Sequence, residues 1–139
     1  MAKQSDRKLS RREVRDLDVE IGFLEGLVRR DPAYVEALQL LGDDYSDRGR
    51  PAEGLCVDER LRQLRPDDSG VRFNYACSLA LNGLFERACE EIESALDLGY
   101  RDFKWLHRDP DLAELRKHPS FKKLKTRIKS LEIPEAAEE

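Results

Sequence analysis

The chain has 139 residues, of which 40% are hydrophobic and 39% charged, and its formal net charge is −4. This length suits a single domain with a modest core. The sequence contains no run approaching the roughly 18 consecutive apolar residues that a membrane-spanning helix requires, so we expect no membrane insertion. Many charges and few aromatic residues favour helices with one apolar stripe and a solvated back.

The N-terminal part is predicted to be a basic tail followed by one long helix. Residues 1–15 carry a net charge of +4 and lack the apolar stretch of a secretory signal, and we expect residues 1–8 to be disordered. From Val14 to Val28, apolar residues recur at steps of three and four, which predicts an amphipathic helix from about residue 10 to residue 30. Asp31 and Pro32 end this helix, so residues 9–31 are interpreted as a capping helix.

A repeat with a period of 34 residues occupies the middle of the chain. This offset pairs Asp31-Pro32 with Arg65-Pro66, Leu27 with Leu61, Gly49 with Gly83, and Leu64 with Leu98. So many matches in one register indicate two repeats, residues 33–66 and residues 67–100, and periods of this length are typical of stacked helical units. Each repeat is predicted to be a pair of helices joined at Gly49 or Gly83, because glycine suits the left-handed conformation at a helix end.

The repeats also carry small residues where two helices would cross. These small residues are Gly42, Ala76, Ala88 and Ala95. The pattern also includes Tyr45 and Pro66. The pattern resembles the tetratricopeptide repeat (TPR) over residues 33–100. The resemblance implies an all-α fold, a right-handed superhelix of antiparallel helix hairpins with capping helices at both ends. The sequence departs from the family pattern at Asp58, where a large apolar residue is usual, and at Leu38 and Arg72, which occupy the usual tryptophan place.

Residues 101–131 are predicted to form capping helices that close the domain of residues 9–131. Residues 100–106 should form a short turn of helix, and Asp109-Pro110 and His118-Pro119 should each start another helix. The run from Trp105 to Leu112 resembles a segment that often closes bacterial repeat arrays. Residues 132–139 are interpreted as an acidic tail.

We find no set of residues in the sequence that predicts catalysis. His107 and His118 lie eleven residues apart, without a further ligand at a metal-binding spacing. The cysteines, Cys56, Cys77 and Cys89, are an odd number without close pairing, so we expect reduced, semi-buried thiols in a cytoplasmic protein. We therefore expect no enzymatic activity, no metal and no cofactor.

The TPR resemblance implies a concave groove lined by the first helix of each repeat. Transferred position by position, it implies a groove containing Gln39, Leu40, Asp43, Asp47, Phe73, Asn74, Cys77 and Leu81. The leading hypothesis is an adaptor that binds a protein or peptide segment there. Two interpretations stay open for the apolar ridge of Phe73, Cys77 and Leu81: ordinary core beneath the terminal helices, or anchors for a peptide. Since Asp43 occupies a place that is basic in carboxylate clamps, we do not expect acidic C-terminal tails to bind.

Two alternatives to the adaptor hypothesis stay open. Residues 100–129 carry a net charge of +6, which suits nucleic acid or an acidic protein, but the nearby Phe121 alone makes no stacking platform. A solvated basic face is the simpler interpretation, so nucleic-acid binding is the lesser prediction. The apolar ridge could also mate with a second copy and give a homodimer.

Overall fold

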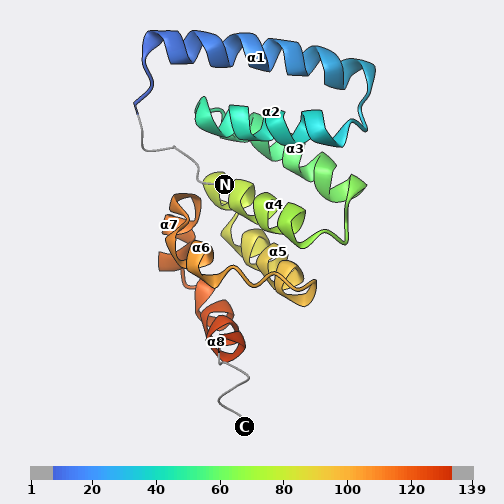
Figure 1. Ribbon diagram of the computed structural model, residues 1–139. Helices are drawn as coiled ribbons and strands as arrows, with labels where there is room; N and C mark the ends of the chain where they lie inside the picture. Colours follow the sequence, from blue (N-terminus) through green and yellow to red (C-terminus); the bar gives the residue numbers. More distant parts are fainter. Residues whose placement is uncertain (1–7, 133–139) are drawn as a thin grey trace.

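The structure is a computed structural model that describes residues 8–132 (Figure 1). All regular secondary structure in this range is helical, which confirms the predicted all-α class. Among the described residues, no helix is both long and apolar enough to cross a membrane. The tails predicted at residues 1–8 and 132–139 fall outside the described range except for Lys8 and Glu132.

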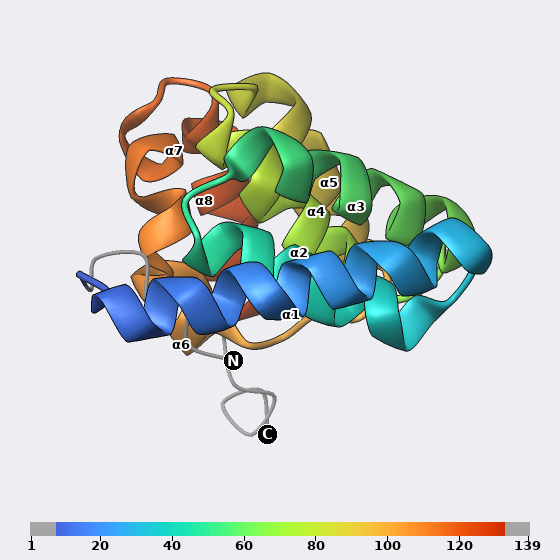
Figure 2. The same cartoon turned by 90° about the horizontal axis from the view of Figure 1, so that it is seen from above.

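The first helix, α1, runs from Arg11 to Arg30, close to the predicted bounds. Ser10 and Glu13 form a reciprocal capping box at its start, which supplies partners for two backbone N–H groups that a helix end leaves unpaired. Ile21 and Leu24 are the fully buried residues of α1, and they pack with residues of α2 and α3. Figure 2 shows α1 lying across one end of the molecule.

Four helices of similar length follow as two hairpins. They are α2 (Val35–Asp47), α3 (Pro51–Leu64), α4 (Ser69–Leu81) and α5 (Phe85–Asp97). Gly49 and Gly83, which join the helices of each pair, both have a φ of 76°, the left-handed conformation that the sequence predicted. The side-chain amide of Asn82 donates to the carbonyl oxygen of Pro51 over 3.1 Å and so ties the turn of the second hairpin to that of the first.

The C-terminal part folds into short elements that pack on the second hairpin. They are α6 (Phe103–Arg108), a 3-10 turn (Pro110–Leu112), α7 (Ala113–Lys117) and α8 (Phe121–Leu131). The helix expected from Tyr100 begins only at Phe103, because the side chain of Asp102 caps it. The helix expected at Pro110 begins as the 3-10 turn, which Asp109 caps in the same way.

The buried apolar residues divide into two clusters. We call the first the N-terminal core; it comprises Ile21, Leu24, Ala37, Leu38, Leu41, Tyr45, Val57, Leu61 and Val71. The second, the C-terminal core, joins α4 and α5 to the short helices, with Phe73, Leu79, Ile92, Leu106, Leu112, Leu115 and Ile128 among its members. Leu98, which pairs with Leu64 in the 34-residue register, is 38% exposed beside the turn at Gly99.

Candidate functional site

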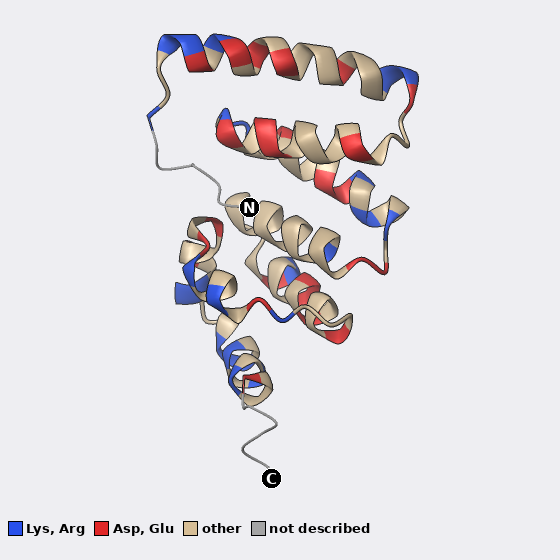
Figure 3. Ribbon diagram, viewed as in Figure 1, with Lys and Arg blue, Asp and Glu red and all other residues tan. Residues whose placement is uncertain are grey.

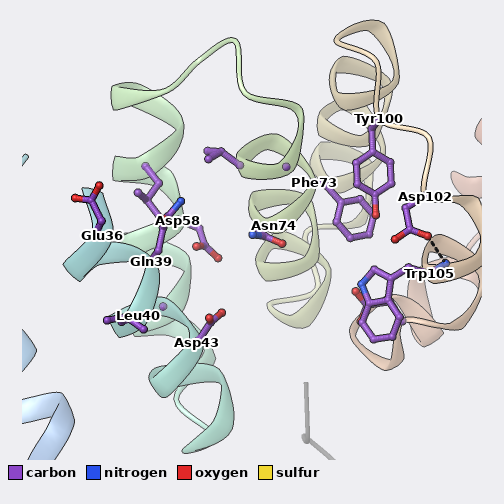
Figure 4. Close-up of a pocket in the computed structure, with 15 residues that line it drawn as sticks. Glu36, Gln39, Leu40, Asp43, Asp58, Phe73, Asn74, Tyr100, Asp102 and Trp105 are labelled. Atoms are coloured by element: carbon purple, nitrogen blue, oxygen red, sulfur yellow. Dashed lines mark hydrogen bonds between the residues drawn. The ribbon is translucent and has the colours of Figure 1, made fainter. Parts of the chain in front are cut away.

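An open cavity of about 680 Å³ lies between α2, α4 and residues 100–109 (Figure 4). Fifteen residues line it, drawn from segments that are far apart in the chain. α2 forms one wall, α4 forms the floor, and the start of the C-terminal segment forms the opposite wall. The cavity therefore exists only because the C-terminal segment folds back beside α4.

The α2 wall consists of side chains on one face of that helix. Glu36, Gln39, Leu40 and Asp43 recur at helical spacing and line the cavity. The other face of α2 is held in the N-terminal core by Leu38 and other buried residues. Leu40 is 52% exposed, so this wall offers one large apolar side chain among polar ones.

The floor of the cavity combines an exposed amide with a buried ring. Asn74 is exposed and stands in the centre of the view in Figure 4, between the two walls. Phe73 lines the cavity although only 2% of its surface is exposed. Its ring stacks on that of Tyr100, with centroids 4.4 Å apart and an interplanar angle of 8°, and this contact joins the floor to the far wall.

The far wall carries two partly buried aromatic residues, Tyr100 and Trp105, with Asp102 between them (Figure 4). A side-chain oxygen of Asp102 accepts a hydrogen bond of 3.2 Å from the backbone N–H of Trp105, which caps α6 and fixes the start of that helix. Burial is the main cause that raises the pKa of the Tyr100 hydroxyl above its usual value.

Beneath this wall, a buried polar cluster links α4 to the C-terminal segment. The Cys77 thiol donates to Asp109 Oδ2 over 3.3 Å, and Asp109 Oδ1 accepts from the backbone N–H of Asp111 over 2.9 Å. Cys77, Asp109 and Asp111 also bring possible metal-ligand atoms within 4.8 Å of one another. The contacts of Asp109 cap the 3-10 turn and fasten it to α4, so the geometry gives this cluster a structural role.

Asp58 introduces a buried carboxyl group at the edge of the cavity. It is 8% exposed, lines the cavity, and accepts a hydrogen bond from the Ser78 hydroxyl on α4. A Cβ added at Gly42 would lie 3.2 Å from Asp58 Oδ1, so glycine leaves the space that the carboxyl group occupies. Asp58, one of the residues that depart from the TPR pattern, thus bridges α3 of the first hairpin and α4 of the second.

Five of the eight residues predicted for the groove line the cavity: Gln39, Leu40, Asp43, Phe73 and Asn74. Asp47, Cys77 and Leu81 do not line it. The expectation of a partner contact was wrong for Cys77, which is 0% exposed and bonded to Asp109. The ridge had two interpretations, ordinary core or peptide anchors. Cys77 and almost the whole surface of Phe73 are buried as ordinary core, whereas Leu81 is 40% exposed.

The far wall was missed by the sequence reasoning. The positions transferred from the TPR family lie only on first helices, so they could not include Tyr100, Asp102 or Trp105. One signal was available in the sequence: three aromatic residues and an acidic residue lie within residues 100–105, at the end of the second repeat and just after it. Such rings need a partner surface, which α4 provides.

Negative charge dominates the cavity. Its lining includes the carboxyl groups of Glu36, Asp43, Asp58, Asp102 and Asp109, and none of the fifteen lining residues is lysine, arginine or histidine. Figure 3 shows where the basic residues gather instead: at the start of α1 and over α7 and α8. On α8, Arg127 is paired with Glu93 and Asp97, each over 2.6 Å.

The three cysteines differ in environment. Cys89 is buried, and desolvation raises the pKa of its thiol to about 11, so the thiolate is scarce at neutral pH. Cys56 is exposed, which contradicts the expectation that all three cysteines are semi-buried packing residues.

No known protein-family model matches the chain. Over 99 aligned residues, which cover 69% of the chain, the sequence is 31% identical to a protein of Arabidopsis thaliana whose name describes it as chloroplastic. The match covers 30% of the length of that plant protein. The chain is thus similar to part of a considerably longer protein.

Proposed function

We propose that this protein is a non-enzymatic interaction module with a TPR-like superhelix, which holds a protein or peptide segment in the cavity between α2, α4 and residues 100–109. The observation that carries the proposal is the cavity itself. At about 680 Å³ it has the size of a ligand site, and it combines an exposed apolar side chain, aromatic rings and amides that can bond a peptide backbone.

Three features support the TPR-like part of the proposal. α2 and α4 begin 34 residues apart, at Val35 and Ser69, as the repeat requires. The turns at Gly49 and Gly83 have the same φ. Consecutive helices from α1 to α5 also pack on one another in chain order (Figure 1), as in repeat proteins.

The alternative functions have less support. Phe121 is 5% exposed, so α8 offers no aromatic ring on which a base could stack, and Arg127 is already paired with acidic residues. A homodimer through the apolar ridge would need Phe73 and Cys77, which are buried. A cytoplasmic location stays a prediction from the sequence, and the plant relative is named as a chloroplastic protein.

Peptide display tests the proposal directly. Random peptides are selected on the full chain and then tested on an Asn74→Tyr variant, in which a bulky ring fills the cavity floor. Gln63→Tyr is the matched control, because Gln63 is also exposed but does not line the cavity. We expect selected peptides to lose at least about tenfold in affinity for the Asn74 variant, roughly 1.4 kcal/mol, and to bind the Gln63 variant normally. Selected peptides that bind both variants equally would refute this use of the cavity.

A further inference from the structure

We propose that the segment held in the cavity is basic, and that it places a lysine or arginine side chain between the carboxyl group of Asp102 and the ring of Trp105. This inference rests on the proposed function and specifies the chemistry of the partner. It is carried by the juxtaposition of facing acidic walls with an aromatic side chain in one cavity.

The first argument is the charge of the two walls. Asp43 projects from α2 towards the cavity, and Asp102 stands on the opposite wall, so a guest between them meets a carboxyl group from each side (Figure 4). Glu36 also lines the cavity, farther along α2. When charges of one sign line a cleft, the electrostatic potential is strongest in the space that the cleft encloses. A cationic segment is attracted there, whereas an acidic one is repelled and gains no compensating partner.

The second argument is the pairing of Asp102 with Trp105. The two residues line the same wall and are joined by the cap hydrogen bond of 3.2 Å, which fixes the backbone of Trp105 relative to the carboxyl group. A lysine or arginine head group gains energy over the face of an indole ring. Arginine can also form paired hydrogen bonds to a carboxylate, so one guest side chain can use both groups.

The cavity offers little exposed apolar surface to an apolar peptide. Leu40 is the only exposed large apolar side chain among the lining residues, because Phe73, Leu61 and Val71 are each no more than 5% exposed. The phosphates of a nucleic acid would face the carboxyl groups. A basic segment is therefore the occupant that the described cavity fits best.

Trp105 provides a built-in reporter, because it is the single tryptophan of the chain. The probes are three ten-residue peptides without tryptophan: one with two arginines and two lysines among glycine, serine and leucine, one with glutamine at those four positions, and one with glutamate there. We expect the basic peptide to shift or quench Trp105 emission and to bind at least about tenfold more tightly than the glutamine peptide. Binding should weaken severalfold between 50 mM and 300 mM salt, because ions screen exposed charges.

Matched charge variants locate the effect. Glu36→Gln, Asp43→Asn and Asp102→Asn together neutralise the walls, and asparagine at position 102 can still cap α6. The control combines Asp67→Asn, Glu86→Gln and Glu90→Gln, which removes three exposed carboxyl groups outside the cavity. We expect about a tenfold loss of basic-peptide affinity in the wall variant and less than a twofold change in the control.

The outcomes separate this inference from the proposed function. If the glutamine peptide binds as well as the basic one, or both triple variants lose affinity equally, the inference of a basic guest is wrong. If display yields peptides that lack lysine and arginine and are blocked by Asn74→Tyr, the inference fails while the proposed function stands. If no selected peptide is blocked, the proposed function itself fails.

Two further outcomes would reassign the occupant. Lys3→Glu with Arg7→Glu changes charge in the N-terminal segment of the full chain. A change of Trp105 emission in that variant without peptide would mean that the chain occupies its own cavity. Trp105 emission that depends on protein concentration would mean that a second copy does so. Either result would overturn the proposal of a separate basic partner.

Discussion

The N-terminal and C-terminal cores are built from hairpins of the same sequence period, yet they differ in what covers them. On the side away from the second hairpin, α1 is the described helix that covers the first hairpin, and its outer side leaves Val19 69% and Phe23 64% exposed. The second hairpin is covered by α6, α7, α8 and the 3-10 turn, and its core holds seventeen buried residues against nine. We therefore expect the two hairpins to differ in stability, because the apolar area that each buries depends on the elements that cover it.

The buried acidic groups of the N-terminal and C-terminal parts also differ in their surroundings. In the C-terminal part, Asp109 accepts hydrogen bonds from a thiol and a backbone N–H. In the N-terminal part, Asp44 is 7% exposed and lies beside another carboxyl group, that of Glu20 on α1. Burial, followed by the hydrogen bond to Glu20 and the nearby negative charges, raises the pKa of Asp44 to about 7. The α1–α2 contact is therefore weakest when Asp44 is ionised.

The largest effect on stability is expected from truncating one buried leucine side chain in each core. Leu38 and Leu79 are both 0% exposed, and replacing either by alanine should lower the free energy of unfolding by about 2–5 kcal/mol. Since the N-terminal core is smaller, Leu38→Ala should speed hydrogen exchange in α1, α2 and α3 well before α5 and α8. Leu79→Ala should speed exchange throughout the described helices.

Hydrogen exchange resolved by mass spectrometry distinguishes the two variants. If Leu38→Ala accelerates exchange in α8 as much as in α1, the two cores unfold as one unit. The difference in size between the two cores would then have no effect on the stability of the individual helices.

A smaller effect is expected from pH. An acid whose pKa is higher in the folded protein than in the unfolded chain binds its proton more tightly when folded. The contribution of Asp44 is therefore fully present below its ordinary pKa of 3.8 and is lost as the pH rises through about 7. Asp44→Asn should stabilise the protein at pH 8 by on the order of 1–2 kcal/mol and change little at pH 4.

Thermal unfolding followed by circular dichroism from pH 4 to pH 8 measures this difference. Asp67→Asn is the control, because Asp67 is exposed in the loop between the hairpins. An Asp44→Asn variant that gains nothing between pH 5 and pH 8 would show that the carboxyl group is ionised at no cost in the folded protein.

The smallest effects are expected at the glycines. Gly49→Ala and Gly83→Ala place a Cβ at a φ of 76° and should each cost about 1 kcal/mol. Gly22→Ala in α1 is the opposite case, because a Cβ there meets no atom within 4 Å and alanine favours a helix, so it should gain about 0.5–1 kcal/mol. Urea unfolding of the three variants checks both signs. Similar stability for Gly22→Ala and Gly49→Ala would contradict the argument.

The sequence predicted the middle of the molecule well because its signals are local. A 34-residue period, apolar steps of three and four, and glycines at fixed places located α1 to α5 to within a few residues. The TPR resemblance, transferred position by position, implied five of the residues that line the cavity, all on α2 and α4. Whether those five bind a partner stays a prediction.

By itself, then, the sequence determined that the chain forms helices, where most of them begin and end, and which side of each is apolar, since these follow from backbone preference and periodicity. Only the tertiary structure decided that Trp105 and Asp102 face α2 across the cavity. It also decided that Cys77 is buried against Asp109 and that Asp58 bridges the two hairpins. These contacts join positions 20 to more than 60 residues apart. Those of Cys77, Asp102 and Trp105 depend on the path by which the last third of the chain returns across α4. No short-range pattern encodes that path, because many side chains far from one another must pack together to fix it.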